Sequence, residues 1–284
     1  MKILDNETLK KIQSLSLQVS IPLSGQAAGN RKSRSKGSSV EFSDYREYVP
    51  GDDFRRIDWN AYGRFNKLFV KLFMEEREAP VHIFLDTSLS MHYGEPDKNL
   101  AARRLAAALS YISLTAYDRV HILPWSDSVQ GPFGPYRTQA AFMEVVDLLE
   151  RFENSGESRF NDALRKLEWK AGRGISVVIT DGLVDQGMGE GLKYLKYLRQ
   201  EVFLCHILSQ QELSPNLSGA LELIDCETGR SMEVTVSNAL LGAYEKKLKQ
   251  FLAEMQEQCK KWGVHYALVP SDMPVDKMVK SVVC

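Results

Sequence analysis

The chain has 284 residues, of which 44% are hydrophobic and 26% charged, so it can bury a substantial core. Its formal net charge of -1 provides no global field that would attract nucleic acid or an anionic membrane. The four cysteines form no C-x-x-C pair, which argues against a zinc site or a disulfide framework. No apolar run approaches the roughly 18 to 20 residues that span a bilayer, and the N-terminus does not resemble a signal peptide. We therefore expect a cytoplasmic protein without direct membrane insertion.

We expect residues 1–79 to form an N-terminal extension. Apolar residues at helical spacing predict a short amphipathic helix over residues 5–17, packed on the main body. Residues 24–39 are rich in Gly, Ser and basic residues, and form either a solvated loop or a loop that docks an anion or a partner. The next segment mixes aromatic and charged residues, which predicts ordered structure with one or two strands before residue 74. Its charges between Asp52 and Asp58 indicate ion pairs, with a second cation site as the alternative.

Residues 80–284 alternate apolar strand patterns with amphipathic helix patterns and form the second expected domain. The predicted strands are residues 81–85, 119–125, 174–180, 201–208 and 264–269. The predicted helices are residues 97–117, 139–152, 161–169, 192–198 and 239–262. Such alternation is typical of an α/β fold with a mostly parallel sheet, flanking helices and right-handed crossovers. Two short strands around Glu227–Arg230 are expected to form a hairpin.

The segment Val81–Met91 ends an apolar strand in one carboxylate and two hydroxyls, Asp86, Ser88 and Ser90. In open α/β sheets, ligands bind at the carboxyl ends of the strands. Hard divalent cations such as Mg²⁺ take about six oxygen ligands, several of them water. The loop therefore indicates half of a metal shell, although a polar turn that caps the next helix has the same residue types. The strand over residues 174–180 also ends in a carboxylate, that of Asp181.

These residues carry a resemblance to the von Willebrand factor A fold. Asp86-Thr87-Ser88-Leu89-Ser90 matches its D-x-S-x-S motif, and Thr180-Asp181-Gly182 matches its later strand end. The resemblance implies a metal-ion-dependent adhesion site, which also takes a threonine from an intervening loop. Here that loop reads Gly156-Glu157-Ser158, with Ala163-Leu164 at the family's usual offset, so Ser158 replaces the threonine. The resemblance thus implies five metal-site residues, namely Asp86, Ser88, Ser90, Ser158 and Asp181, with Mg²⁺ or another divalent cation such as Mn²⁺ or Ca²⁺.

A longer motif resembles the family called domain of unknown function 58. It reads E-F-x-D-Y-R-x-Y-x-P-G-D-D-x-R-x-I-D-W over Glu41–Trp59, and D-x-E-T-G follows over Asp225–Gly229. The resemblance covers about residues 18–282. It implies a bacterial protein associated with MoxR-type AAA+ ATPases, which are thought to act as chaperones in protein assembly or activation. We therefore expect a MoxR-type ATPase and an unknown client protein as partners.

The pattern favours binding without bond chemistry, and we expect no catalytic residue. In this interpretation Ser88, Ser90 and Ser158 bind the metal, while Asp86 and Asp181 hold it or its waters. A Glu or Asp of a partner would then complete the metal shell. The alternative is a metal-dependent phosphoester hydrolase, but Ser88 stands where such enzymes usually place a second carboxylate, and no downstream basic residue is evident. A nucleic-acid binder is disfavoured because the chain is nearly neutral and shows no recognised module.

Overall fold

The computed structural model describes residues 3, 5–16, 41–74, 79–167, 172–184 and 187–283. The described chain divides into two units, a larger one of residues 3–16 and 79–283 and a smaller one of residues 41–74. The basic loop at residues 24–39 lies outside the described residues. Among the described helices, none has both the length and the apolarity that crossing a bilayer requires.

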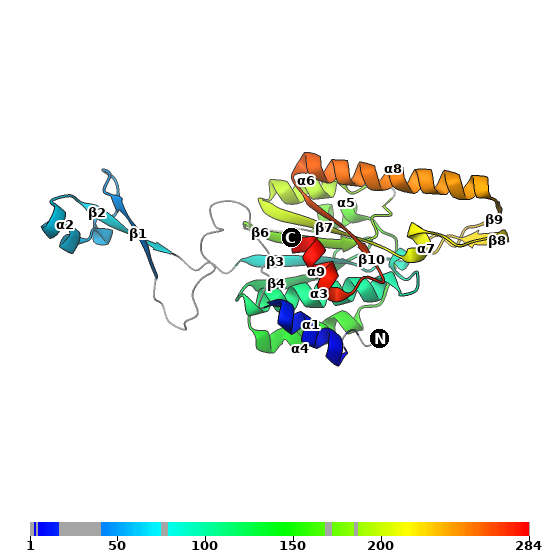
Figure 1. The fold of residues 1–284 in the computed structure, drawn as a ribbon, viewed down its shortest axis with the longest axis horizontal. Coiled ribbons are helices and arrows are strands. Elements are labelled where there is room, and N and C mark those ends of the chain that lie inside the picture. The colour runs from blue at the N-terminus through cyan, green and yellow to red at the C-terminus, as the bar shows by residue number, and fades with distance from the viewer. Residues whose placement is uncertain are drawn as a thin grey trace. The chain divides into compact units, whose positions relative to one another are not determined.

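The larger unit is built on a six-stranded sheet (Figure 1). Its strands in chain order are β3 (Pro80–Asp86), β4 (Arg119–Trp125), β5 (Phe133–Tyr136), β6 (Gly174–Thr180), β7 (Gln200–Leu208) and β10 (His265–Pro270). Their spatial order is β10-β7-β6-β3-β4-β5, and only β5 among them runs antiparallel to its neighbour. Counted from β3, this is the doubly wound order 3-2-1-4-5-6. The predicted von Willebrand factor A-like, Rossmann-like fold class is therefore confirmed.

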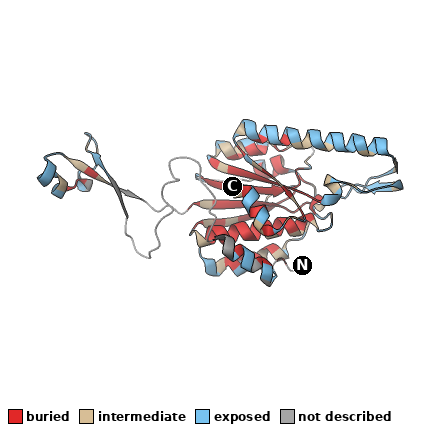
Figure 2. Cartoon of the chain, in the orientation of Figure 1, coloured by how far each residue is buried: buried red, intermediate tan, exposed pale blue. Residues whose placement is uncertain are grey.

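Helices cover both faces of the sheet and create two apolar cores (Figure 2). The first face carries α1 (Asn6–Ser16), α3 (Lys98–Thr115), α4 (Phe142–Arg151) and α9 (Val275–Val283). The second face carries α5 (Phe160–Lys166), α6 (Gly189–Tyr197) and α8 (Asn238–Trp262). Because strand side chains alternate, Ile83 and Leu85 enter the first core whereas Phe84 enters the second. Helix α3 is buried on nearly all sides, since it lies between the sheet and other helices.

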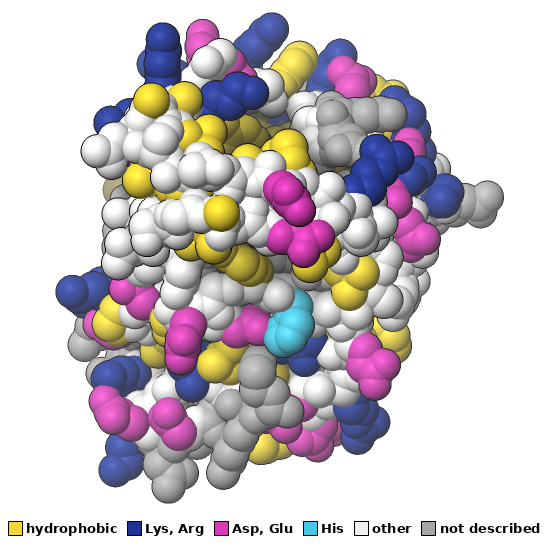
Figure 3. Space-filling model, turned by 90° about the vertical axis from the view of Figure 1, so that its right-hand side faces the viewer, with side chains coloured by type: hydrophobic (Ala, Val, Ile, Leu, Met, Phe, Trp, Pro, Cys, Tyr) yellow, Lys and Arg dark blue, Asp and Glu magenta, His cyan; other side chains and the backbone are white. Residues whose placement is uncertain are grey.

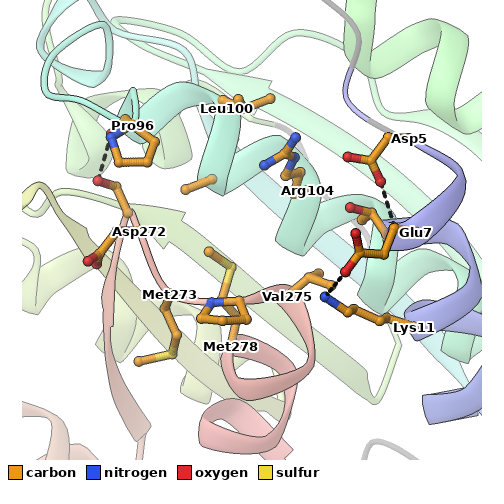
Figure 4. A pocket seen from close by; sticks show the side chains of 14 residues that line it. Asp5, Glu7, Lys11, Pro96, Leu100, Arg104, Asp272, Met273, Val275 and Met278 are labelled. Atoms are coloured by element: carbon orange, nitrogen blue, oxygen red, sulfur yellow. Dashed lines mark hydrogen bonds and ion pairs between the residues drawn. The ribbon is translucent and has the colours of Figure 1, made fainter.

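Helix α1 belongs with the larger unit, whereas our expected boundary at residue 79 placed it in the N-terminal extension. It packs on α3 and α9, and Ile12 is fully buried there. A pocket of about 210 Å³ remains between α1, α3 and the start of α9 (Figure 4). Charged residues at this pocket pair locally, as Lys11 does with Glu7 at 2.7 Å. The apolar side of α1 thus explains its position, because separating it from α3 would expose Ile12 to water.

Strand β5, helix α2 and helix α9 are among the elements that the sequence did not predict. The sequence around β5 is rich in turn residues, including Gly134 and Pro135, but the strand pairs with β4 at the sheet edge, where proline is tolerated. Helix α2 (Trp59–Phe65) lies in the segment for which the sequence predicted only one or two strands, and Asp58 caps the helix by accepting bonds from the amides of residues 60 and 61. The C-terminal helix α9 was not predicted. Its valine-rich composition favours strands, but its apolar side packs into the first core.

The smaller unit accounts for much of the long motif over Glu41–Trp59. Strand β1 (Glu41–Glu47) pairs antiparallel with β2 (Phe69–Met74), and the one-turn helix η1 (Phe54–Arg56) and α2 lie between them in sequence. Asp58 accepts a hydrogen bond from the Tyr45 hydroxyl at 2.8 Å and pairs with Lys71 at 3.1 Å. Asp52 pairs with Arg46 at 2.7 Å. Asp52 and Asp58 therefore form ion pairs, as expected, but their partners Arg46 and Lys71 lie outside the segment between Asp52 and Asp58. Asp53 instead accepts a hydrogen bond from the Arg55 amide at 3.0 Å.

Buried histidines on the sheet generate a pH prediction. His82 on β3 is 4% exposed and stacks on His121 of β4, with ring centroids 4.9 Å apart. Burial, followed by the charge of His121, lowers the pKa of His82 to about 4. Below pH ~6.5 the unfolded chain therefore binds a proton that the native state does not bind. Stability from this residue is complete above pH ~6.5 and is lost as the pH falls towards 4.

Between pH ~6.5 and 4, we expect the free energy of unfolding to fall by up to about 3 kcal/mol less in His82→Gln than in wild type, because glutamine does not titrate. The measurement is the free energy of unfolding in urea at several pH values between 4 and 7, with EDTA present. Ile83→Val changes a buried residue of the same strand that does not titrate, and this matched control should keep the wild-type slope. Equal slopes for His82→Gln and wild type would contradict the assignment.

Candidate metal centre

The candidate site lies at the carboxyl ends of β3 and β6. These two strands are neighbours, and the chain leaves them towards opposite sides of the sheet. This is the topological switch point, where diverging loops leave room for ligands in doubly wound folds. Figure 3 looks onto this side of the molecule and shows acidic side chains together with a histidine near the middle of the face. The fold therefore positions the residues that follow β3 and β6 at one location.

Asp86 is the centre of the hydrogen-bond network at this site, and its side chain is fully buried. One carboxylate oxygen accepts a bond from the backbone N–H of Ser88 at 2.9 Å. The other accepts bonds from the hydroxyls of Ser158 at 3.2 Å and Thr180 at 2.6 Å. Three chain segments thus converge on one carboxylate. Thr180 was quoted in the family motif but was not predicted as a site residue, and its position as the last residue of β6 explains its role.

Ser88 and Ser90 present their hydroxyls side by side, with the two oxygens 3.0 Å apart. Ser88 occupies the cap position of the short helix η2 (Leu89–Met91), but its side chain makes no capping hydrogen bond. The capping alternative for this side chain is therefore wrong. Two oxygens at adjacent corners of a Mg²⁺ octahedron, each about 2.1 Å from the metal, lie about 3.0 Å apart. The serine pair therefore has the spacing of two neighbouring magnesium ligands.

The loop that carries Ser158 is held against the Asp86 loop by several bonds. The Ser155 amide donates to the Thr87 carbonyl at 2.8 Å, and the Asn154 side chain donates to the Ser88 carbonyl at 2.9 Å. The Leu89 amide donates to the Gly156 carbonyl at 3.2 Å. Ser158 itself is 3% exposed. Serine in place of threonine thus retains a hydroxyl that donates to Asp86 and has oxygen lone pairs for a cation.

Asp181 is buried beside this network and pairs with a lysine that the sequence did not indicate. Lys98, the first residue of α3, donates to Asp181 at 2.8 Å and to Glu212 at 2.6 Å. Burial alone lowers an ammonium pKa, but these two carboxylates outweigh it and raise the pKa of Lys98. The structure thus corrects the expectation that no basic residue lies near the site. Lysine at a helix start usually faces water, so the sequence carried no signal for this contact.

The donor set fits a hard divalent cation. Burial, together with the charge of Asp181, raises the pKa of Asp86 to about 7, which indicates that negative charge here lacks full compensation. Searched over the described residues, the chain has no group of three or more His, Cys, Asp and Glu that could bind a metal. Any ion at this site would therefore need the serine hydroxyls and water in addition to whatever carboxylates reach it. Such oxygen-rich, partly hydrated shells suit Mg²⁺, Mn²⁺ or Ca²⁺ and not Zn²⁺.

The chain matches one family model and is similar to several known proteins. The family model described as "Protein of unknown function DUF58" matches residues 44–253. An uncharacterized protein of Mycobacterium bovis is 25% identical over 245 residues, which cover 83% of this chain and 76% of that protein. An aerotolerance-related membrane protein of Bacteroides fragilis is 17% identical with a TM-score of 0.44, covering 72% of this chain and 98% of that one. The SpRpn10 VWA domain is 14% identical with a TM-score of 0.42, and the match covers 72% of this chain and 94% of that domain.

Arg103 provides a test of how the Ser158 loop is positioned. This α3 residue is 4% exposed and donates to the carbonyls of Leu149 and Phe152 at 2.8 Å and 2.5 Å, and to the side chain of Asn154 at 3.2 Å. Arg103→Met leaves these acceptors without their donor, which costs roughly 1–3 kcal/mol for each buried group. We expect about 3 kcal/mol lower stability and faster hydrogen exchange at the Ser155 amide.

Arg104→Met is the matched control, because Arg104 lies on the same helix but donates to the Ile3 carbonyl. It should leave the exchange of the Ser155 amide unchanged. Equal exchange rates in Arg103→Met and wild type would show that the loop does not depend on Arg103.

Proposed function

This chain belongs to the DUF58 family, and we propose that it is a metal-dependent protein-binding module that binds a partner's carboxylate through Mg²⁺. The observation that carries this proposal is the convergence of five residues with oxygen-bearing side chains at the switch point. Four of these residues are linked by hydrogen bonds, one of which comes from the Ser88 backbone amide. Asp86 connects three of the segments involved, so the site is preorganised by the fold. This arrangement supports a metal-ion-dependent adhesion site.

The roles of the five residues follow from their contacts. The hydroxyls of Ser88, Ser90 and Ser158 would hold the cation, since each has oxygen lone pairs at the site. Asp86 orients two of these serines, and it would balance the metal charge together with Asp181. When bound, Mg²⁺ supplies positive charge that attracts a carboxylate, and Mn²⁺ or Ca²⁺ could replace it. The protein's own residues would position the ion and exclude other ligands.

A metal-dependent phosphoester hydrolase is the second candidate, and Lys98 is the observation that favours it, because a lysine could neutralise a phosphate. Two features argue against it. Asp86, the residue that would attack phosphorus, is fully buried, and both of its oxygens already accept hydrogen bonds. Lys98 is bound to Asp181 and Glu212 and so is not directed at an open substrate position. We therefore favour binding without catalysis.

A MoxR-type AAA+ ATPase is the proposed partner, and an unidentified client protein would bind with it. The support is the resemblance of Glu41–Trp59 and Asp225–Gly229 to the family motifs, together with the family membership. In this proposal the chain acts as an adaptor in the assembly or activation of other proteins in the bacterial cytoplasm. Nucleic acid is not proposed as a partner, because the net charge is -1.

Removal of one hydroxyl tests the metal site. We expect Ser88→Ala to lower Mg²⁺ affinity at least about tenfold, because a ligand is lost without a large change in packing. Isothermal titration calorimetry of the purified chain provides the measurement. Ser110→Ala is the matched control, since the Ser110 hydroxyl is also buried but bonds to the carbonyl of Ala106 within α3.

Equal Mg²⁺ affinities for Ser88→Ala and Ser110→Ala would reject the proposed site. Metal-dependent turnover of p-nitrophenyl phosphate by the same protein, lost in Asp86→Asn, would favour the hydrolase instead.

The partner is tested with the purified MoxR-type ATPase of the source organism. We expect the wild-type chain, immobilised in the presence of Mg²⁺, to retain the ATPase, and Ser88→Ala to retain at least about tenfold less. The variant is preferred to chelation because the ATPase itself needs Mg²⁺ for its nucleotide. Ser110→Ala should behave as wild type. Equal retention by all three proteins would separate ATPase binding from the metal centre, and no retention by any would exclude this partner.

A further inference from the structure

The hairpin formed by β8 (Gly219–Ile224) and β9 (Ser231–Val236) ends in a rigid turn. Asp225 accepts bonds from the amides of Glu227 at 2.9 Å and Thr228 at 2.8 Å. The Gly229 amide donates to the Asp225 carbonyl at 2.8 Å, and Gly229 has a positive φ of 69° that favours glycine. Asp225 and Gly229 of the D-x-E-T-G motif are therefore explained by the turn, but Glu227 is not.

The Glu227 side chain reaches the candidate metal centre. One of its carboxylate oxygens accepts a hydrogen bond from the Ser158 amide at 3.4 Å. Its other oxygen is buried and has no donor in good hydrogen-bonding geometry in the part of the chain that the structure describes, although Ser90 lies near the carboxylate. Burial raises the pKa of Glu227 and the charge of Asp181 adds to this, whereas the Ser90 hydroxyl lowers it. Glu227 therefore contacts the backbone of one proposed metal-site residue, Ser158, and interacts electrostatically with Ser90 and Asp181.

We propose that Glu227 is an internal carboxylate ligand, which occupies the position that a partner's carboxylate would take at the metal centre. The inference rests on the proposed function, because it assumes that this centre holds a divalent cation. The Ser158 amide contacts one oxygen of Glu227, and the other oxygen is buried without a hydrogen-bond partner among the described residues. A buried carboxylate oxygen without a donor is costly, and a metal ion removes that cost.

The hairpin is suited to release this ligand. Its residues are mostly exposed, including Ile224 at 67% and Met232 at 61%, so few of its apolar contacts would be lost on movement. Its two strands pair with each other and not with the central sheet. A partner carboxylate would therefore compete with Glu227 for one position, and its binding would free the hairpin turn from the site.

The test uses Mn²⁺ as a paramagnetic probe and measures the relaxation of water protons. Each protein ligand on Mn²⁺ displaces a bound water, so Glu227→Ala should raise the relaxivity of the loaded protein. It should also weaken Mn²⁺ binding by about tenfold, because one charged ligand is lost. Added acetate should lower the relaxivity of Glu227→Ala, where the position is open, and should have little effect on wild type. Glu222→Ala, an exposed carboxylate on β8 of the same hairpin, is the matched control and should behave as wild type.

A second measurement requires no metal. Hydrogen exchange at the Ser158 amide should be faster in Glu227→Ala than in Glu222→Ala, because the acceptor of this amide is lost. The inference would be overturned if Glu227→Ala and Glu222→Ala had the same relaxivity and the same response to acetate. If Ser88→Ala still lost Mn²⁺ binding in that case, the metal centre itself would stand. Absence of Mn²⁺ binding to the wild type would reject the centre and, with it, the assignment of Glu227 as a metal ligand.

Discussion

The site depends on a single buried carboxylate at the end of the central strand. Asp86 is fully enclosed, and an ionised carboxylate is costly to bury without hydrogen-bond donors. The fold supplies these donors from the Ser88 amide, the Ser158 hydroxyl and the Thr180 hydroxyl. Each comes from a different part of the chain, so satisfying Asp86 also fixes the relative positions of three segments. The same contacts that offset the cost of burial therefore assemble the proposed ligand set.

The second buried carboxylate is compensated differently. Asp181 has an ion pair with Lys98, and Lys98 is shared with Glu212 of the short helix α7 (Gln210–Leu213). Asp86 accepts hydrogen bonds from neutral groups, and burial with the charge of Asp181 raises its pKa to about 7. The positive charge of Lys98 thus neutralises Asp181 and Glu212 and is not paired with Asp86. A divalent cation beside the serine hydroxyls, as proposed, would complement the remaining negative charge.

The sequence predicted those parts of the fold that local patterns control. Apolar runs over residues 81–85, 174–180 and 201–208 become central strands, because only a strand covered on both faces tolerates such composition. The motif residues Asp86 and Asp181 follow directly from strand ends. Lys98 and Arg103 could not be found in this way, since their roles arise from contacts with residues 83 and 46 positions away. Strand β5 was missed because Gly and Pro indicate turns unless a sheet edge is available.

The hairpin turn connects the proposed metal centre to the exposed surface. Strands β8 and β9 contribute little to either apolar core, so the hydrogen bond between Glu227 and the Ser158 amide is a contact that links the hairpin turn to the site. Competition for one coordination position is reciprocal. The more favourable the free energy of Glu227 binding to the metal, the weaker the binding of an external carboxylate at the same position. A metal alone would then stabilise the closed hairpin, whereas metal with a partner would release it. In this proposal, binding of a partner at the edge of the sheet would change the position of the hairpin.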